Sequence, residues 1–380
     1  MKNVLISGGG GFIGSHLALR LADLGYGVRV LDNLSEQIHG ANPETTSPLY
    51  AAIKGRVEFI CGTVTSREDW EKALKNQHVV VHLAAETGTG QSMYQVEKYT
   101  QVNIQGTSIL LDILTNQPHQ VEKVVVASSR AIYGEGKYIS KELGVVYPPH
   151  RDDADMRAGD FEVKYPGSTK LEVAATDESS KIHPSSVYGI TKQVQEQLTL
   201  NVCGAIGMPA VAFRFQNVYG PGQSLSNPYT GILSIFSNLI KSGQNINIFE
   251  DGRETRDFVF ISDVVEATIA GIERECDNQQ VFNVGTGKQT TVLDVARTLI
   301  KHYGREVPMV VSGMYRLGDI RHNFADTTRL REVLKVTPKV EFDEGMRRFA
   351  EWVDAQSASG NGFERSLEEM RSRGLLRNSA

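Results

Sequence analysis

The sequence predicts an α/β fold in which a doubly wound parallel sheet carries a smaller C-terminal substrate-binding lobe. Three observations support this prediction. Short β-branched runs alternate with amphipathic stretches through the first third of the chain, and a glycine-rich turn joins the first strand to the first helix. In addition, 380 residues with a hydrophobic content of 40% are enough to bury one large core.

The expected elements follow one another at the spacing of strand–helix–strand units, which implies right-handed crossovers between parallel strands. The expected strands are Asn3 to Ser7, Gly27 to Leu31, Val57 to Cys61, Val79 to Leu83, Lys123 to Ser128, Ala210 to Phe215 and Gln280 to Val284. The expected helices among the early strands are Ser15 to Leu24 and Val96 to Leu114.

The sheet domain is expected to span residues 1–215 and to be completed by about residues 257–287. Residues 216–256 and 288–380 have mixed character, so we expect them to form a lobe over the carboxyl edge of the sheet. Residues 135–184 are polar, rich in glycine, proline and charge, and without a sustained period, which predicts an insertion. Near the C-terminus, a helical pattern covers Glu364 to Leu376.

The composition argues against several classes of partner. The net charge is −5, so no basic field is available to hold nucleic acid. The N-terminus lacks the basic flank of a secretory signal, and no apolar stretch approaches the roughly 18 residues of a membrane span. Cys61, Cys203 and Cys276 are far apart, which predicts neither disulfides nor a cysteine metal site. We therefore expect a cytoplasmic protein that binds no nucleic acid, membrane or metal.

The turn GGGGFIG predicts a dinucleotide site. Gly8, Gly11 and Gly14 lie directly after a strand and directly before a helix, where a pyrophosphate meets backbone amides and the helix dipole. Asp32 ends the second strand and can accept hydrogen bonds from the adenosine ribose, whereas it would repel a 2′-phosphate. Asn33 rather than arginine follows, so NAD is favoured over NADP. The alternative is a flexible glycine turn with a surface aspartate.

A candidate catalytic group consists of Ser129, Tyr188 and Lys192. The tyrosine and lysine of YGITK are four residues apart, so they share one face of a helix, and Ser129 ends a strand. An ammonium about 4 Å away contributes roughly 1 kcal/mol in bulk water but about 4 kcal/mol in a covered cleft. We therefore expect Lys192 to lower the pKa of Tyr188 in a covered site, which makes the tyrosine an acid/base. The alternative is a core tyrosine, a solvated lysine and a serine that closes a strand.

These motifs resemble those of the extended short-chain dehydrogenase/reductase family, in its NAD-dependent nucleotide-sugar epimerase/dehydratase branch. SGGGGFIGSHL has the family's GxxGxxG spacing, and HLAA at His82 to Ala85 and VNIQGT around Asn103 match two further motifs. The resemblance covers roughly residues 1–134 and 185–350 and implies a Rossmann-type sheet that binds NAD. Thr63 departs from the pattern, because the family often has an acidic residue there to hold the adenine amine. The NAD-binding residues that the resemblance implies are Gly8, Gly11, Phe12, Ile13, Gly14, Asp32, Asn33, Thr63, Val64, Leu83, Ala84, Ala85, Asn103, Tyr188 and Lys192.

The second half of the chain resembles the sugar-nucleotide branch of this family. RFQNVYGPGQ implies that Asn217 contacts a diphosphate, and RDFVFISDV implies that Arg256 reaches the nucleotide phosphates. Arginine suits this role because its planar fork binds phosphate oxygens in pairs, although a surface salt bridge is the alternative for Arg256. Arg321 in GDIRH is a weaker phosphate or ribose candidate. The other expected substrate contacts are Thr87, Gln91, Ser129 and Arg130.

The residues after Ser129 indicate the reaction. Sugar 4,6-dehydratases of the branch typically carry Asp-Glu there, and the related decarboxylases usually retain the Glu, whereas this chain has Arg130 and Ala131. Neither side chain can protonate a departing hydroxyl, which favours a 4-epimerase that oxidises and re-reduces C4. A nucleotide-sugar oxidoreductase that releases a keto sugar, and a non-catalytic NAD-sensing protein, remain alternatives.

The segment ETGTGQSMY, SSRAIYGEG and the long insertion look most like enzymes assigned as dTDP-L-rhamnose 4-epimerases. UDP-hexose or UDP-hexuronate 4-epimerases are the closest alternative. Several of those relatives have paired cysteines that form a metal ribbon in the insertion, whereas this chain has Ser140, Leu143, Tyr165 and Ser168 at those places, so we expect no zinc there. The insertion is expected to be a flap beside the sugar site. The resemblance also implies a homodimer through helices around Val96 to Leu114 and Val187 to Cys203.

Overall fold

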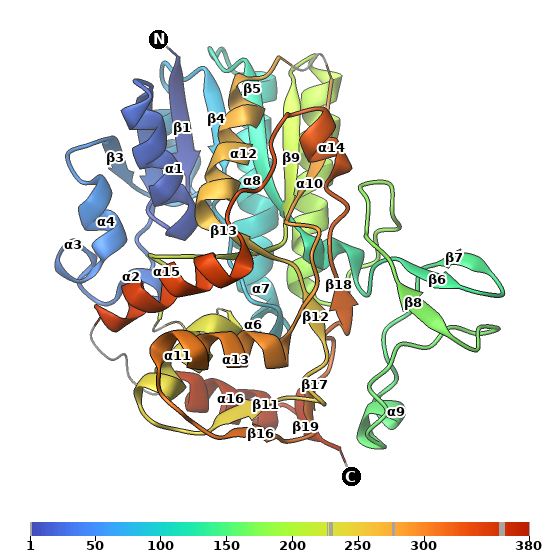
Figure 1. Ribbon diagram of the computed structural model, residues 1–380. Coiled ribbons are helices and arrows are strands. Elements are labelled where there is room, and N and C mark those ends of the chain that lie inside the picture. Colours follow the sequence, from blue (N-terminus) through green and yellow to red (C-terminus); the bar gives the residue numbers. More distant parts are fainter. Residues whose placement is uncertain (1, 226, 228–230, 276–277, 357–361, 380) are drawn as a thin grey trace.

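The computed structural model describes residues 2–225, 227, 231–275, 278–356 and 362–379. Its centre is a seven-stranded sheet in which every pairing is parallel (Figure 1). All seven strands expected from the sequence belong to it, so the predicted doubly wound α/β fold is confirmed. In spatial order the strands are β14 (Gln280–Val284), β9 (Ala210–Phe215), β5 (Lys123–Ser129), β4 (Val79–His82), β1 (Asn3–Ser7), β2 (Gly27–Asp32) and β3 (Glu58–Cys61).

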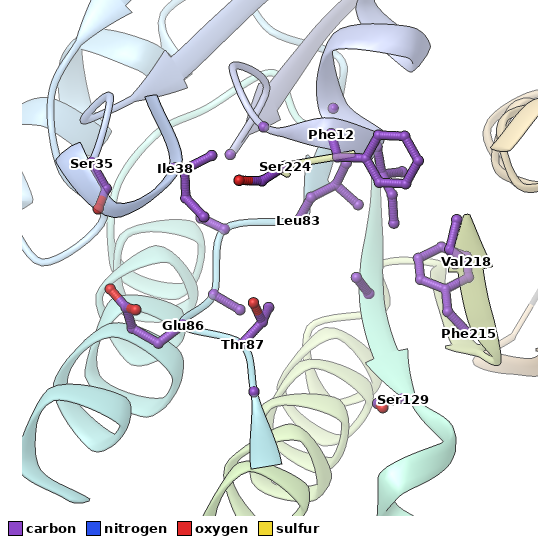
Figure 2. Close-up of a pocket in the computed structure, with 18 of the residues that line it drawn as sticks. Phe12, Ser35, Ile38, Leu83, Glu86, Thr87, Ser129, Phe215, Val218 and Ser224 are labelled. Carbon is purple, nitrogen blue, oxygen red and sulfur yellow. The ribbon is translucent and has the colours of Figure 1, made fainter. Parts of the chain in front are cut away.

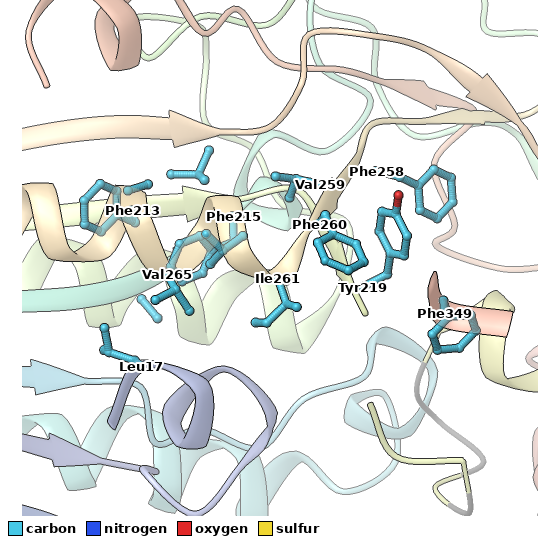
Figure 3. Packing of buried hydrophobic residues seen from close by; sticks show 14 of the residues in the cluster. Leu17, Phe213, Phe215, Tyr219, Phe258, Val259, Phe260, Ile261, Val265 and Phe349 are labelled. Atoms are coloured by element: carbon cyan, nitrogen blue, oxygen red, sulfur yellow. The ribbon is translucent and has the colours of Figure 1, made fainter. Parts of the chain in front are cut away.

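Helices cover both faces of this sheet, because successive side chains of a strand point to opposite faces. In β1, Val4 and Ile6 join one hydrophobic cluster and Leu5 joins the other. The first cluster contains α1 (Phe12–Asp23) and α12 (Ile261–Glu273) and continues into the lobe through the aromatic side chains of Figure 3. The second cluster contains residues of α5 (Arg67–Leu74), α8 (Gly106–Asn116) and α10 (Val187–Ala205).

The helix expected over Val96 to Leu114 is interrupted by a wider turn. It consists of α7 (Val96–Tyr99), a π-helical segment η1 (Thr100–Gln105) and α8. Two buried side chains in this region bind the chain that follows β4. The Tyr99 hydroxyl donates to the carbonyl of Thr87 at 2.5 Å, and the Asn103 amide bonds both backbone groups of Glu86 at 2.7 and 3.1 Å. The hydrophobic period could not reveal this wider turn, because it depends on contacts with a distant loop.

The lobe lies below the carboxyl edge of the sheet and is built from two stretches of chain (Figure 1). Its strands pair across these stretches, since β11 pairs with β16, and β12 with both β15 and β18, while β10 pairs with β13, which leads back toward the sheet domain. The bounds are β10 (Asn217–Tyr219), α11 (Ile232–Lys241), β11 (Ile246–Ile248), β12 (Thr255–Arg256), β13 (Phe258–Phe260), β15 (Thr290–Thr291), α13 (Val292–Tyr303), β16 (Met309–Val311), β17 (Met314–Arg316), β18 (His322–Asn323) and α15 (Phe342–Asp354).

The C-terminal segment is shorter as a helix than its sequence pattern suggests. The helix α16 (Gly362–Ser372) ends before Gly374, whose φ of +69° favours glycine, and β19 (Leu376–Asn378) pairs antiparallel with β17. The remaining short elements are α2 (Glu36–His39), α3 (Pro43–Thr46), α4 (Pro48–Ile53), α6 (Thr89–Ser92), η2 (Arg130–Tyr133) and α14 (Thr328–Glu332). Among the described residues, no helix is both long and apolar enough to cross a membrane.

The segment expected as an irregular insertion contains a small sheet of its own, which projects to the right in Figure 1. It consists of β6 (Tyr138–Ser140), β7 (Gly144–Val146), α9 (Asp153–Arg157) and β8 (Leu171–Val173), in the order β7-β6-β8. These strands have three residues each, too few for a recognisable sequence period.

Relatives are expected to have metal-binding cysteines at four positions of this insertion. In this chain, the side chains at two of those positions form hydrogen bonds with the same carboxylate. Ser140 Oγ and Ser168 Oγ donate to Glu142 Oε2 at 3.0 and 3.4 Å, and the hydroxyl of Thr169 donates to the other oxygen. Hydrogen bonds from the Thr169 hydroxyl, the Glu142 backbone amide and the Ser140 hydroxyl lower the pKa of Glu142 to about 2, so its carboxylate remains charged and joins the two loops. No group of three metal-binding side chains occurs among the described residues.

Candidate active site

A cavity of about 490 Å³ lies at the carboxyl ends of the central strands. Figure 2 shows Phe12 and Leu83 on one side of it, Glu86 and Thr87 below, and Ser129 at the end of β5. Every expected NAD-binding residue lines this cavity except Asn103. Of the expected substrate contacts, Thr87, Ser129, Arg130 and Asn217 line it, whereas Gln91, Arg256 and Arg321 do not.

The glycine turn leaves room for a pyrophosphate at the start of α1. Gly8 has a φ of +72°, and its amide donates to the carbonyl of Leu31 at 2.8 Å. A Cβ atom on Gly14 would lie 2.3 Å from the Gly8 carbonyl oxygen, so only glycine permits this turn. A Cβ on Gly11 would meet only the Gly8 oxygen, at 3.4 Å, which leaves open space beside the first amides of the helix. This cradle fits a dinucleotide.

Asp32 is held firmly at the adenosine end of this cradle. Its two carboxylate oxygens accept hydrogen bonds from the amides of Gly10 and Leu34, both at 2.8 Å. His39 Nε2 lies 4.0 Å from Asp32, and burial lowers the His39 pKa although the carboxylate opposes this. Each carboxylate oxygen has a second lone pair, so Asp32 can still accept bonds from ribose hydroxyls.

Two other members of the expected NAD set show how the loops are positioned. The amide of Thr63 donates to Asp69 Oδ2 at 2.9 Å, so an acidic side chain from α5 supports the position where the family often has one. Asn103 reaches across to Thr191 Oγ1 at 2.9 Å, in addition to its contacts with Glu86. Asn103 therefore connects η1, the loop after β4 and α10, and it supports the wall of the cavity rather than lining it.

Ser129, Tyr188 and Lys192 come together at the other end of the cavity. Ser129 ends β5 and its Oγ accepts a hydrogen bond from the amide of Ala131 at 3.1 Å. The helix α10, which carries the other two residues, begins after Ser186, whose hydroxyl caps the amide of Gly189 at 3.1 Å. The sheet order places this group across β1 from Asp32, which is the separation that the two ends of a dinucleotide require.

The electrostatics of this group differ from the sequence-based expectation. Burial raises the pKa of Tyr188, whereas the hydrogen bond with Ser129 and the positive charge of Arg130 act to lower it. Burial also lowers the pKa of Lys192 to about 7, which Glu196 partly opposes. In this arrangement burial dominates at Tyr188, and Arg130 is the cation whose charge opposes it, so a lowering of the Tyr188 pKa by Lys192 stays a prediction for the NAD-bound site.

Arg130 and Asn217 form a polar pair beside Tyr188. Arg130 Nε donates to Asn217 Oδ1 at 2.7 Å, and both residues line the cavity. Burial and the nearby charge of Arg256 lower the Arg130 pKa to about 9. A buried cation next to a second cation favours an anionic ligand, which agrees with the expected diphosphate contact of Asn217.

Two expected substrate contacts lie behind the cavity wall. The guanidinium of Arg256 donates to three carbonyl groups, those of Thr255, Ile320 and Arg321, at 2.7 to 2.9 Å. Gln91 is buried and exchanges amide hydrogen bonds with Gln37, which itself lines the cavity. In this arrangement Gln91 supports a cavity residue, and Arg256 acts on the site through its charge on Arg130.

Arg321 occupies a different environment from the one expected. Its side chain is fully buried and pairs with Glu162, Glu250 and Asp251 at 2.7 to 3.0 Å. Arg151 of the insertion also binds Glu250, through two nitrogens at 2.8 and 2.7 Å. These ion pairs connect the insertion to the lobe, and they leave Arg321 no free face for a phosphate. The expectation that Arg321 binds phosphate or ribose is corrected accordingly.

Several cavity residues were not expected from the sequence. Those named below lie near expected positions such as Asn33 and Asn217, so proximity along the chain was the one available signal. Ser128 Oγ and both side-chain polar atoms of Gln216 are buried without hydrogen-bond partners among the described residues, so this part of the wall has unused polar groups. The additional lining residues include Ser35, Gln37, Ile38 and His39 after β2, and Gln216, Gln223 and Ser224 after β9.

Comparison with known proteins agrees with this geometry. The model of the NAD dependent epimerase/dehydratase family matches residues 4–152 and 164–285. The chain belongs to this family. It is 38% identical to a dTDP-L-rhamnose 4-epimerase of Burkholderia thailandensis over 93% of this chain and 95% of that protein. The predicted family is therefore confirmed.

Solved structures of epimerases share the fold. A UDP-glucose 4-epimerase from Thermotoga maritima with UDP-glucose has a TM-score of 0.74 and 29% identity, covering 93% of this chain and 98% of that one. A UDP-glucose 4-epimerase from Thermus thermophilus in complex with NAD has a TM-score of 0.73 and 26% identity, covering 93% and 100%. The prediction of a Rossmann-type fold and the prediction of NAD as the cofactor are both confirmed by membership of this NAD-dependent family.

Proposed function

We propose that this enzyme inverts C4 of a nucleotide-activated sugar by transient oxidation and re-reduction. The observation that carries the proposal is the placement of Ser129, Tyr188 and Lys192 in one cavity with the glycine turn and Asp32. When bound, NAD supplies a reversible acceptor for the hydride at C4. The protein must then move one proton, orient the sugar and keep water out.

Each of the three residues has a distinct role in this mechanism. Tyr188 removes the proton from the C4 hydroxyl and returns it to the same oxygen after the configuration has changed. Ser129 donates a hydrogen bond to that oxygen while it is a carbonyl. Lys192 holds the nicotinamide ribose and, when protonated, stabilises the tyrosinate together with Arg130.

The surroundings of Ser129 support epimerisation over dehydration. Loss of water from C5 and C6 requires an acid and a base beside the sugar. At the two positions after Ser129 this chain has Arg130, which is engaged by Asn217, and Ala131. Neither can donate a proton to a leaving hydroxyl at neutral pH.

A dTDP-linked 6-deoxyhexose, with dTDP-L-rhamnose as the first candidate, is the proposed substrate. The support is the 38% identity to an enzyme of that name over nearly the whole chain. A UDP-hexose is the second candidate, because the solved neighbours include a UDP-glucose 4-epimerase at 29% identity.

A panel of sugar nucleotides tests both candidates. The purified enzyme is incubated with dTDP-, UDP-, GDP- and CDP-hexoses, and the products are separated by chromatography. We expect a C4 epimer from a dTDP-6-deoxyhexose. Release of a keto sugar with net NADH would indicate an oxidoreductase, and no product from any member would indicate an NAD-binding protein without catalysis.

The same proposal assigns a function to each domain and an oligomeric state to the protein. Residues 1–215 and 257–287 would bind NAD, and residues 216–256 and 288–380 would bind the sugar nucleotide. A cytoplasmic homodimer is proposed through α7, α8 and α10, where Val96 and Ile190 are nearly half exposed. Light scattering at micromolar concentration checks the dimer.

A further inference from the structure

A row of buried polar side chains extends from Lys192 into the protein interior. Its members come from five separate elements, β1, β4, η1, α8 and α10, and none has measurable solvent exposure. Buried polar groups of this kind are costly unless every donor and acceptor is matched, so their pattern of bonds can be deduced. The members are Ser7, His82, Asn103, Thr107 and Gln195.

The contact with Lys192 fixes the orientation of the Gln195 amide. Lys192 Nζ lies 2.5 Å from Gln195 Oε1, and an ammonium has donors alone, so the amide oxygen must face the lysine. The amide nitrogen then points away and donates to Thr107 Oγ1 and to His82 Nε2, both at 2.9 Å.

The remaining bonds agree with this orientation of the Gln195 amide. If His82 Nε2 accepts from Gln195, the proton of the neutral imidazole is on Nδ1, which then donates to Ser7 Oγ at 2.6 Å, and Nε2 also lies 2.9 Å from Thr107 Oγ1. Burial and the Lys192 charge lower the His82 pKa to about 3, which agrees with a neutral ring. The Thr107 hydroxyl accepts from Gln195 and donates to the carbonyl of Asn103 at 2.6 Å.

We propose that Gln195 is a positioning residue of the epimerase, because its locked carbonyl holds the Lys192 ammonium one helical turn from Tyr188. This inference rests on the proposed function. The ionisable groups that interact with Lys192 are Glu196 and His82, and Tyr188 precedes it by one turn of α10. Glu196 is paired with Arg214 at 2.6 Å, His82 is neutral, and Tyr188 is the acid/base. Gln195 is the one hydrogen-bond acceptor of Nζ in the described part of the chain.

This role explains two motifs that the NAD contacts alone do not. HLAA supplies His82 and VNIQGT supplies Asn103 and Thr107. His82 and Thr107 contact the amide nitrogen of Gln195, and Asn103 holds Thr107, so both motifs support Gln195 on the side away from Lys192. Since hydrogen bonds to ionised groups are stronger than neutral ones, Gln195 favours the protonated form of Lys192. Loss of this acceptor should make the ammonium easier to deprotonate, and a carboxylate in its place should make it harder.

Two substitutions with opposite expected effects test the proposal. The rate of epimerisation should fall on the alkaline side as Lys192 loses its proton. Gln195→Leu should move this fall to lower pH by about one unit, with about a tenfold loss of kcat at pH 8, and Gln195→Glu should move it to higher pH. Thr199→Val is the matched control, because Thr199 is buried one turn further along α10 and bonds the Gln195 backbone carbonyl at 2.8 Å.

The pH dependence of NAD binding provides a second readout that needs no turnover. The pH at which NAD affinity has fallen by half should be lower for Gln195→Leu and higher for Gln195→Glu. Thr199→Val should leave this pH unchanged. Identical profiles for all variants, or shifts of the same sign for Gln195→Leu and Gln195→Glu, would overturn the positioning role. Shifts in NAD binding without epimerisation of any sugar would overturn the proposed function and leave the Gln195–Lys192 contact supported.

Discussion

Lys192→Met should make the protein more stable at neutral pH while it removes activity. Burial lowers the Lys192 pKa from about 10.5 to about 7, so the folded state binds this proton less strongly than the unfolded state. Below pH 10.5, the pKa of lysine in the unfolded chain, burial of this group lowers the free energy of unfolding. This destabilisation decreases as the pH rises from 7 to 10.5 and the lysine loses its proton in both states. With about 1.4 kcal/mol for each pH unit, the cost at pH 7 is about 4 kcal/mol.

Methionine keeps the apolar stem of the side chain but leaves Gln195 Oε1 without its donor. An unsatisfied buried acceptor costs about 1–3 kcal/mol, so the expected net gain at pH 7 is about 2 kcal/mol. Urea unfolding of the NAD-free protein at pH 6.5 and 9.5 measures this gain, which should shrink at the higher pH. NAD affinity and kcat should both fall.

Lys123→Met is the matched control for this measurement. Lys123 is also buried, but its ammonium donates to the carbonyls of Gly271, Ile272 and Arg274 near the end of α12. That ammonium is well satisfied, so its removal should lower the free energy of unfolding. If both variants lowered the free energy of unfolding equally at pH 7, burial of the Lys192 ammonium would not destabilise the fold.

Three further variants test separate parts of the structure. Tyr188→Phe should reduce kcat by about 10²- to 10⁴-fold, because only the proton-transferring oxygen is lost. Calorimetry should show NAD and sugar-nucleotide affinities that are nearly unchanged. A loss of affinity without a loss of kcat would argue against the acid/base role. Gly14→Ala should prevent NAD binding in fluorescence titrations, because the new Cβ would lie 2.3 Å from the Gly8 carbonyl, and normal affinity would refute the tight turn. Burial raises the Glu254 pKa to about 7, so its folding penalty develops as the pH rises from 4.5 through 7. Glu254→Gln should therefore add up to about 3 kcal/mol of stability at pH 8 and almost none at pH 4, and an equal gain at both would contradict the shift.

The features that local sequence patterns encode were predicted well. The strands that are buried on both faces have continuous β-branched runs, and the Gly8 turn and Asp32 are defined by their distance from strand ends. The features that were missed depend on contacts between distant segments. Neither the wider turn at η1 nor the burial of Arg321 among carboxylates from the insertion and the lobe has a local signal.

The same limit applies to the chemistry of the site. A helical spacing of four was enough to place Tyr188 and Lys192 on one face, and strand order was enough to bring Ser129 to them. The spacing could not show that burial raises the Tyr188 pKa, nor that Ser129 and Arg130 oppose this. Those effects depend on how deeply three separate elements are packed together.

The C4 hydride cycle is tested most directly by an isotope. dTDP-L-rhamnose that carries deuterium at C4 is incubated with the enzyme in ordinary water, and the epimer is analysed by mass spectrometry and NMR. The proposed mechanism predicts that the product keeps deuterium at C4, because the hydride leaves and returns within one closed site. Loss of the label to solvent during inversion would contradict this mechanism and indicate proton exchange beside a carbonyl.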